Sequence, residues 1–190
     1  PYTGCVMAID PSGKGRDETA YCVTKFANGN IYLLDIGGFN AGYSEHTLSK
    51  LVDIAKKHKV NKILIEQNFG QGMFEALLKP YLIKQYPCTT EMVHQQTNKH
   101  RRILDTLEPI ISQHRLIVDK YVVKKDYEET NMLYPQETAL RYQLFYQLSR
   151  LQKEVHSLSQ DDRIDCLQVA CNYWVKHLSR DQELAMKMRK

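Results

Sequence analysis

Three acidic groups stand where a metal-dependent active site would need them, and they lie far apart in the chain. Asp10 ends the apolar run at residues 6–9, and Glu66 ends the run at residues 63–65. Short apolar runs bounded by turn residues are typical of buried strands. An acid at the end of such a strand is costly unless water, a partner group or a cation meets it. Taken alone, Asp10 is better explained as a turn residue that bonds the backbone two positions on.

The third acidic group opens the last predicted helix, in the segment QDDRID at residues 160–165. Residues three apart share a helix face, so Asp162 and Asp165 can point the same way. Asp161 either caps the helix or lies beside the site. The alternative is electrostatic, because acids in a first helical turn are stabilised by the helix dipole.

The carboxyl ends of parallel strands form one edge of a sheet, where ligands bind. If Asp10, Glu66, Asp162 and Asp165 converge there, each pair ~5 Å apart repels by about 3 kcal/mol at an effective dielectric of 20. Oxygen ligands without His or Cys select Mg²⁺ or Mn²⁺. Two such ions ~3.5–4 Å apart would activate water and stabilise the leaving oxygen in phosphodiester cleavage.

Basic residues near these acids are candidates for phosphate contacts, which give affinity and salt dependence rather than sequence readout. Each is also explained as an ordinary solvated side chain. Arg163, between the acids, is expected to pair with its neighbours. The candidates for DNA binding are Lys14, Arg16, Asn68, Arg101, Arg102 and Lys124.

The order of predicted elements indicates one α/β domain with a mixed five-stranded sheet. A three-stranded antiparallel meander precedes parallel strands, and helices flank the sheet. Strands are predicted at residues 4–10, 20–26, 31–39, 62–66 and 89–94, with a possible extra strand at 116–118. Helices are predicted at 45–59 (N-cap Ser44), 73–86, 98–114 (bent or broken at Pro109), 137–154 and 161–178. Residues 119–135 are expected to be irregular.

Composition narrows the class of protein. The net charge of +4, from 26 basic and 22 acidic residues, permits a polyanionic partner. Five cysteines without a CxxC pair argue against a disulfide framework or a zinc site and favour a reducing compartment. No run approaches the roughly 18 apolar residues of a membrane span, and no signal peptide is visible. Because the chain opens on Pro1, we expect a processed product or an excised domain.

Several sequence blocks together resemble the C-terminal nuclease domain of the terminase large subunit from short-tailed phages. They are MAIDPSGKGRDETAYCV, LLDIGGFNAGYSEHTL, ILIEQNFGQGMF, RRILDTLEP and QDDRIDCLQVA. The resemblance implies an RNase H-like fold and an endonuclease that cuts concatemeric double-stranded viral DNA during packaging. Asp10, Glu66 and the Asp162 region match the family's metal-binding acids. Asp165 resembles the fourth acid of Holliday-junction resolvases, whereas Gln160 departs from the His common in the family.

The resemblance also implies a domain organisation and partners. Residues 1–178 would be the nuclease domain and 179–190 a C-terminal tail. No GxxxxGK[ST] motif is present, so the ATPase domain is expected to be absent. The implied partners are double-stranded DNA, the terminase ATPase domain, the small terminase subunit and the portal, with no membrane. The implied location is the cytoplasm of the infected bacterial host.

Three other functions are compatible with the same residues. A Holliday-junction resolvase or RNase H-type nuclease would differ by preferring branched or hybrid substrates. An actin-like ATPase lobe would need a second phosphate loop, which is not found in the sequence. A non-catalytic packaging module would tolerate substitution of the acids.

Overall fold

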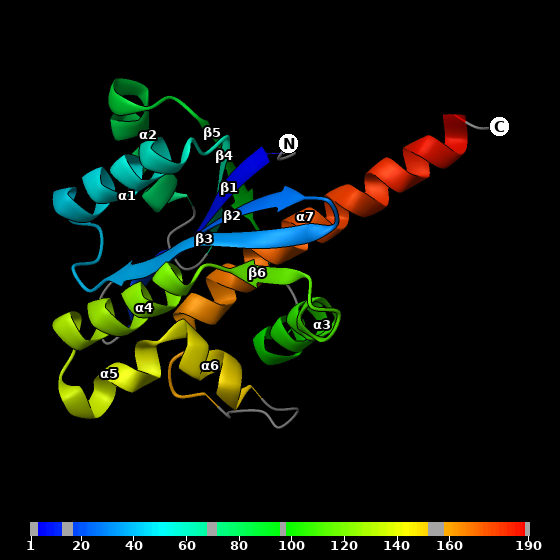
Figure 1. Ribbon diagram of the computed structural model, residues 1–190. Helices are drawn as coiled ribbons and strands as arrows, with labels where there is room; N and C mark the ends of the chain where they lie inside the picture. The colour runs from blue at the N-terminus through cyan, green and yellow to red at the C-terminus, as the bar shows by residue number, and fades with distance from the viewer. Residues whose placement is uncertain (1–3, 13–16, 68–71, 96–97, 152–157, 189–190) are drawn as a thin grey trace.

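A six-stranded mixed sheet lies between two layers of helices (Figure 1). The computed structural model describes residues 4–12, 17–67, 72–95, 98–151 and 158–188, with residues 179–188 described by backbone alone. The strand order is β5-β4-β1-β2-β3-β6. The strands are β1 (Gly4–Asp10), β2 (Thr19–Ala27), β3 (Asn30–Phe39), β4 (Lys62–Glu66), β5 (Thr89–Val93) and β6 (Leu116–Val118).

The predicted meander and parallel strands are confirmed, but the count of five strands is wrong. β1, β2 and β3 pair antiparallel, and β4 and β5 continue parallel to β1. Asn28 and Gly29 turn the chain between β2 and β3 with φ of 50° and 81°, as a tight hairpin requires. The sixth strand is the short segment at residues 116–118, which pairs parallel with β3.

Both faces of β1 are buried, which explains why its sequence is an unbroken apolar run. Met7 and Ile9 pack with helices α1 and α2 on one face, and Val6 and Ala8 pack with α3 and α7 on the other. The helices are α1 (Glu45–His58), α2 (Met73–Gln85), α3 (Lys99–Ser112), α4 (Lys120–Leu133), α5 (Gln136–Tyr142), α6 (Leu144–Arg150) and α7 (Asp162–Met188). No helix in the described part is long and apolar enough to cross a membrane.

Several helix predictions are confirmed in position, and α3 is one continuous helix although it contains a proline. Ser44 caps α1, where its side chain accepts a hydrogen bond from the Thr47 amide. α3 does not break at Pro109. The proline lies in the last turn, and the carbonyl that loses its donor belongs to Asp105, which is exposed to water.

The segment at residues 119–135 is a helix rather than an irregular loop. The buried positions of α4 are Val122, Asp126 and Thr130, four residues apart. Two of the three are polar. The buried positions therefore repeat with the helical period, but the apolar residues in the sequence do not. Asp119 caps this helix by accepting a hydrogen bond from the Tyr121 amide.

Two further helix boundaries differ from the prediction. The single helix predicted at 137–154 is divided at Gln143, which is extended between α5 and α6, so Leu144 is buried while Leu140 stays exposed. The last helix continues to Met188 instead of ending at Leu178. No glycine or proline interrupts this stretch, and the end of α7 projects from the rest of the molecule (Figure 1).

Candidate metal centre

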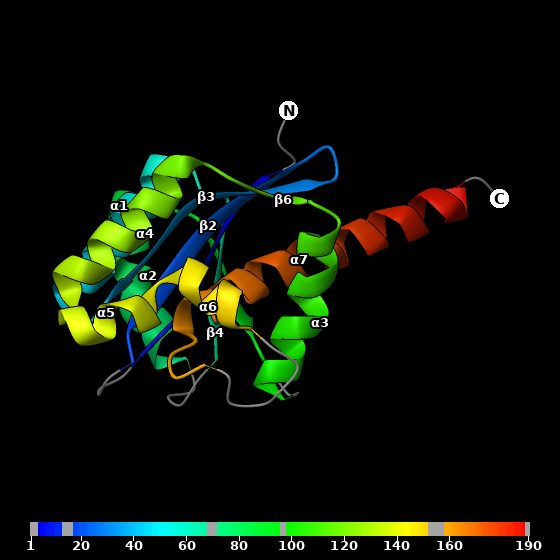
Figure 2. The ribbon, with the colours of Figure 1, turned by 60° about the horizontal axis from the view of Figure 1, so that its bottom comes forward.

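The fold places Asp10 and Glu66 side by side. β1 and β4 are parallel neighbours with Ile9 opposite Ile65, so the acids that end both strands meet at one edge of the sheet. α7 lies beside α3 on the face of the sheet that carries Val6 and Ala8 (Figure 2), and its first turn contains Asp165. One carboxylate oxygen from each of Asp10, Glu66 and Asp165 lies within 4.8 Å of the other two. All three residues are buried.

Two cations of α3 contact these acids. Arg102 Nη2 donates to Asp165 Oδ1 at 2.6 Å and to Glu66 Oε1 at 3.3 Å. Lys99 Nζ lies 2.8 Å from Asp161 Oδ1 and 3.1 Å from Asp165 Oδ2. The cations therefore occupy one side of the carboxylate cluster and reduce its charge without removing it.

Two carboxylate oxygens remain without hydrogen bonds from the described residues. Glu66 Oε2 and Asp165 Oδ2 are inaccessible to water and accept no hydrogen bond there, although Asp165 Oδ2 lies 3.1 Å from the Lys99 ammonium. An unsatisfied buried carboxylate oxygen is costly. An oxygen-only set that leaves Glu66 Oε2 without a donor and Asp165 Oδ2 with an ion pair alone fits a hard divalent cation, Mg²⁺ or Mn²⁺.

The pKa values also show that the two cations do not fully neutralise the clustered carboxylates. Burial, followed by the neighbouring Glu66 and Asp165 carboxylates, holds the pKa of Asp10 well above its usual range. Burial and Asp165 raise the pKa of Glu66 to about 7, even though Arg102 and Lys99 act in the opposite direction. Burial lowers the pKa of Lys99, but Asp165, Asp161 and Asp10 outweigh it, so the net shift is upward and the ammonium stays charged. Near neutral pH the cluster thus favours either bound protons or a further cation.

Asp162 lies beside this cluster rather than in it. Its Oδ2 accepts a hydrogen bond from the Glu18 amide at 3.3 Å. Burial, and then the Glu18 carboxylate, raise the pKa of Asp162 to about 7. Its charge also raises the pKa of Asp10, so the two carboxylates influence one another.

The predicted basic residues are in different environments. Arg102 lies against the acids with 9% of its side chain exposed, whereas Arg101 on the same helix is exposed and lies 3.5 Å from Asp105. Lys124 is exposed on α4 and lies 3.6 Å from Glu128. Lys14, Arg16 and Asn68 lie outside the described residues.

Gln168 is a member of the site that the sequence analysis missed. Its Oε1 accepts a hydrogen bond from Arg102 Nε at 3.1 Å, and its Nε2 donates to Thr106 Oγ1 at 3.0 Å. Gln168 therefore holds the guanidinium that faces Glu66 and Asp165. Its position three residues after Asp165, on the same helix face, is the signal that could have identified it.

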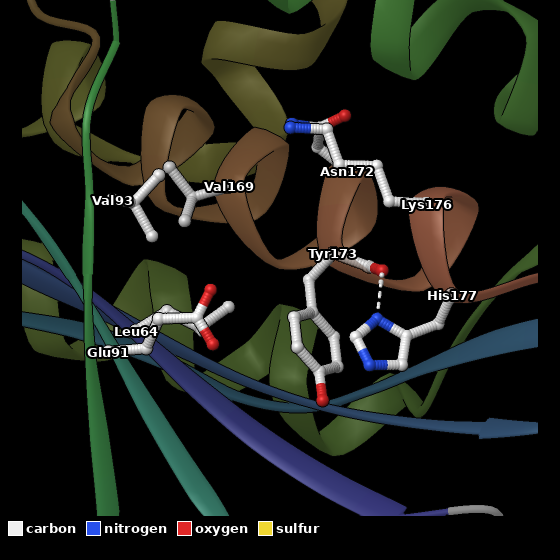
Figure 3. Close-up of a pocket in the computed structure, with 8 residues that line it drawn as sticks. All are labelled: Leu64, Glu91, Val93, Val169, Asn172, Tyr173, Lys176 and His177. Atoms are coloured by element: carbon white, nitrogen blue, oxygen red, sulfur yellow. Dashed lines mark hydrogen bonds between the residues drawn. The ribbon is translucent and has the colours of Figure 1, made fainter. Parts of the chain in front are cut away.

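A pocket lies farther along α7, between this helix and the edge of the sheet (Figure 3). Its apolar part is formed by Leu64, Val93 and Val169. Glu91, Asn172, Tyr173, Lys176 and His177 complete it, and His177 Nδ1 lies 3.1 Å from the Tyr173 carbonyl oxygen. The clustered carboxylates do not line this pocket, so the chemistry of the site lies elsewhere.

Sequence comparison identifies the family. The family described as "Terminase Bacteriophage T7, Ribonuclease H-like domain" matches residues 9–116. This chain belongs to that family. The large terminase subunit of Enterobacteria phage T3 is 40% identical over 172 residues, which cover 90% of this chain. The same match covers 29% of the phage T3 protein, so the chain corresponds to less than a third of that relative.

Solved nuclease domains and large subunits of terminases have a similar fold at low sequence identity. The nuclease domain of human cytomegalovirus terminase, soaked with manganese and bound to an inhibitor, matches 90% of this chain and 83% of its own, at a TM-score of 0.61 and 10% identity. The nuclease domain of the large terminase subunit of bacterial virus Sf6 matches 88% of this chain and 87% of its own, at a TM-score of 0.56 and 12% identity. The large terminase of a thermophilic bacteriophage matches 91% of this chain and 40% of its own, at 0.57 and 11%. The chain therefore has the RNase H-like terminase nuclease fold.

Proposed function

We propose that this domain is a divalent-metal-dependent endonuclease that cuts concatemeric double-stranded DNA during viral genome packaging. The observation that carries the proposal is the cluster of Asp10, Glu66 and Asp165, with two buried oxygens that accept no hydrogen bond from the described residues. Membership of the terminase family gives this cluster a substrate class. The relatives solved with manganese are consistent with a metal-dependent site.

Asp10, Glu66 and Asp165 would hold the metal, with Asp162 beside them, and two Mg²⁺ or Mn²⁺ ions are the proposed complement. Such ions supply an activated water and charge stabilisation at the leaving oxygen of a phosphodiester. Arg102, oriented by Gln168, keeps the Glu66 and Asp165 carboxylates turned toward one another. No protein side chain is assigned as a general base.

Exposed Arg101 and Lys124 are proposed to contact DNA phosphates, together with Lys14, Arg16 and Asn68. Arg102 forms ion pairs with Glu66 and Asp165 in the structure. Its proposed effect on DNA binding would therefore be indirect, through the placement of the metal ligands. The phage T3 relative is much longer than this chain. The terminase ATPase domain, the small subunit and the portal are accordingly proposed partners, in the cytoplasm of the infected host.

Cleavage of supercoiled plasmid tests the proposal. We expect the purified domain to nick the plasmid with Mn²⁺ or Mg²⁺ and not with EDTA. Asp10→Asn should abolish nicking, while Asp53→Asn, an exposed acid on α1, should not. Full activity of Asp10→Asn, or metal-independent nicking, would refute the proposal. Faster cutting of a four-way junction or an RNA–DNA hybrid than of duplex DNA would favour a resolvase or RNase H-type nuclease instead.

A further inference from the structure

A second ionic network lies on the other side of the first turn of α7. Arg163 is completely buried, and its guanidinium contacts three carboxylates. Nε and Nη2 donate to the two oxygens of Glu18 at 2.6 and 3.1 Å. Nη1 donates to Asp126 Oδ1 at 2.8 Å, and Nη2 donates to Glu129 Oε1 at 2.9 Å. One side chain thus joins α7 to the residue before β2 and to α4.

Neighbouring groups hold these carboxylates in place. The Tyr134 hydroxyl donates to Glu18 Oε2 at 2.8 Å, the Phe145 amide to Asp126 Oδ2 at 3.3 Å, and the Gly38 amide to Glu129 Oε1 at 2.9 Å. The network therefore has a defined geometry. Arg163 is presented with a fixed fork of acceptors rather than a loose set of opposite charges.

Strand β3 leaves room for this network through two consecutive glycines. A Cβ atom on Gly38 would lie 2.0 Å from Glu18 Oε2, and a Cβ atom on Gly37 would lie 2.7 Å from Glu129 Oε1. Contacts that short do not occur, so a larger residue at position 38 would displace Glu18, and one at position 37 would displace both Glu129 and the Tyr21 ring. The pair Gly37-Gly38, in a block that carries the family resemblance, thereby acquires a role.

The network is placed to set the direction of Asp165. Residues two apart in an α-helix point about 200° apart around its axis, so Arg163 and Asp165 face opposite sides of α7. A rigid attachment on the Arg163 side fixes the rotation of the helix on the Asp165 side. Buried ion pairs contribute little net stability compared with apolar packing, which makes orientation a better account of this network than stability.

We propose that Arg163 is a positioning residue for the metal centre. Held by Glu18, Asp126 and Glu129, it sets the rotation of α7 and thereby keeps Asp165 within reach of Asp10 and Glu66. The inference rests on the metal centre proposed above. The alternative is that the network only attaches α4 to the sheet.

Calorimetric titration of the purified chain with Mn²⁺ distinguishes these two roles. Arg163→Lys keeps the charge but cannot form the fork of hydrogen bonds, and we expect Mn²⁺ to bind about tenfold to a hundredfold more weakly. The matched control is Val122→Ala, which weakens a different attachment of α4, the packing of the buried Val122 side chain in the apolar core. Val122→Ala should lower the thermal midpoint but leave the Mn²⁺ affinity unchanged. Equal Mn²⁺ affinity in folded Arg163→Lys and wild type would overturn the inference.

A second pair of variants tests the network without changing any charge. Gly38→Ala should displace Glu18 and weaken Mn²⁺ binding, whereas Gly4→Ala, whose Cβ would make only ordinary contacts of 3.5 Å and longer, should not. If Arg163→Lys does not fold, this pair tests the positioning role in its place. Unchanged Mn²⁺ affinity in Gly38→Ala would overturn the inference. If wild type itself binds no Mn²⁺, the metal centre fails and the inference fails with it. If wild type and all folded variants bind equally, only the positioning role fails.

Discussion

The first turn of α7 separates two groups of carboxylates, buried except for the half-buried Glu129, that differ in the hydrogen-bond donors around them. On one side, Arg163 donates to Glu18, Asp126 and Glu129. On the other side, Arg102 and Lys99 approach Glu66 and Asp165 but leave one oxygen of each acid without a hydrogen bond from the described residues. Burial alone therefore does not distinguish the proposed metal centre from the Arg163 network. The difference lies in whether the protein supplies enough donors of its own.

The largest expected effect comes from removing the central cation of the satisfied group. Arg163→Met leaves three carboxylates without it and should lower the free energy of unfolding by about 3–5 kcal/mol, measured by urea denaturation. Arg101→Met, at an exposed ion pair, should cost no more than about 1 kcal/mol. Equal stability of Arg163→Met and wild type would mean that the two groups of acids do not differ in this way.

Removing an acid from the under-satisfied group should reduce cleavage while the protein still folds. Asp165→Asn should reduce Mn²⁺-dependent nicking at least about a hundredfold, or ~3 kcal/mol of transition-state stabilisation, because the proposed metal loses a ligand. Circular dichroism and the thermal midpoint should show that the protein still folds. Retained cleavage would remove Asp165 from the proposed metal ligands.

The pH dependence of stability sharpens the comparison. The pKa of Glu66 is raised from 4.5 to about 7, so the folded metal-free chain retains a proton that the unfolded chain has lost. The contribution of this group to stability therefore falls as the pH rises from about 4.5 to about 7. In EDTA at pH 8, Glu66→Gln should be more stable than wild type by about 1–3 kcal/mol.

Urea denaturation at pH 5 and pH 8 measures this effect. The advantage of Glu66→Gln should shrink at pH 5, where wild-type Glu66 is protonated when folded. It should also shrink in saturating Mn²⁺, because the metal would stabilise wild type more than the variant. A variant less stable than wild type at pH 8 without metal would show that Arg102 already neutralises Glu66.

The smallest expected effects concern the exposed cations outside both groups. Lys124→Gln and Arg101→Gln should each weaken duplex binding modestly and reduce the slope of log affinity against log salt by about 0.9. Fluorescence anisotropy across a salt series measures this slope. Lys50→Gln, an exposed lysine on α1, is the matched control. Identical slopes in all three variants would remove Lys124 and Arg101 from the DNA contacts.

Local sequence signals were sufficient to predict most of the strands and helices. Apolar runs ending on Asp10 and Glu66 predicted two parallel strands whose carboxyl ends meet, and the structure has them as neighbours. The prediction was wrong where burial is polar. In α4, Asp126 and Thr130 occupy buried positions because Arg163 and local hydrogen bonds satisfy them, and hydrophobic periodicity cannot detect such a helix.

The sequence by itself determined the acids available, the strand ends that carry two of them, and the helix that carries the others. Only the tertiary structure decided that Asp165, rather than Asp162, clusters with Asp10 and Glu66. Residues three apart share a helix face but still differ by about 60° in direction. Which of them faces the sheet depends on the rotation of the helix, and that rotation is a property of packing and long-range ion pairs, not of local spacing.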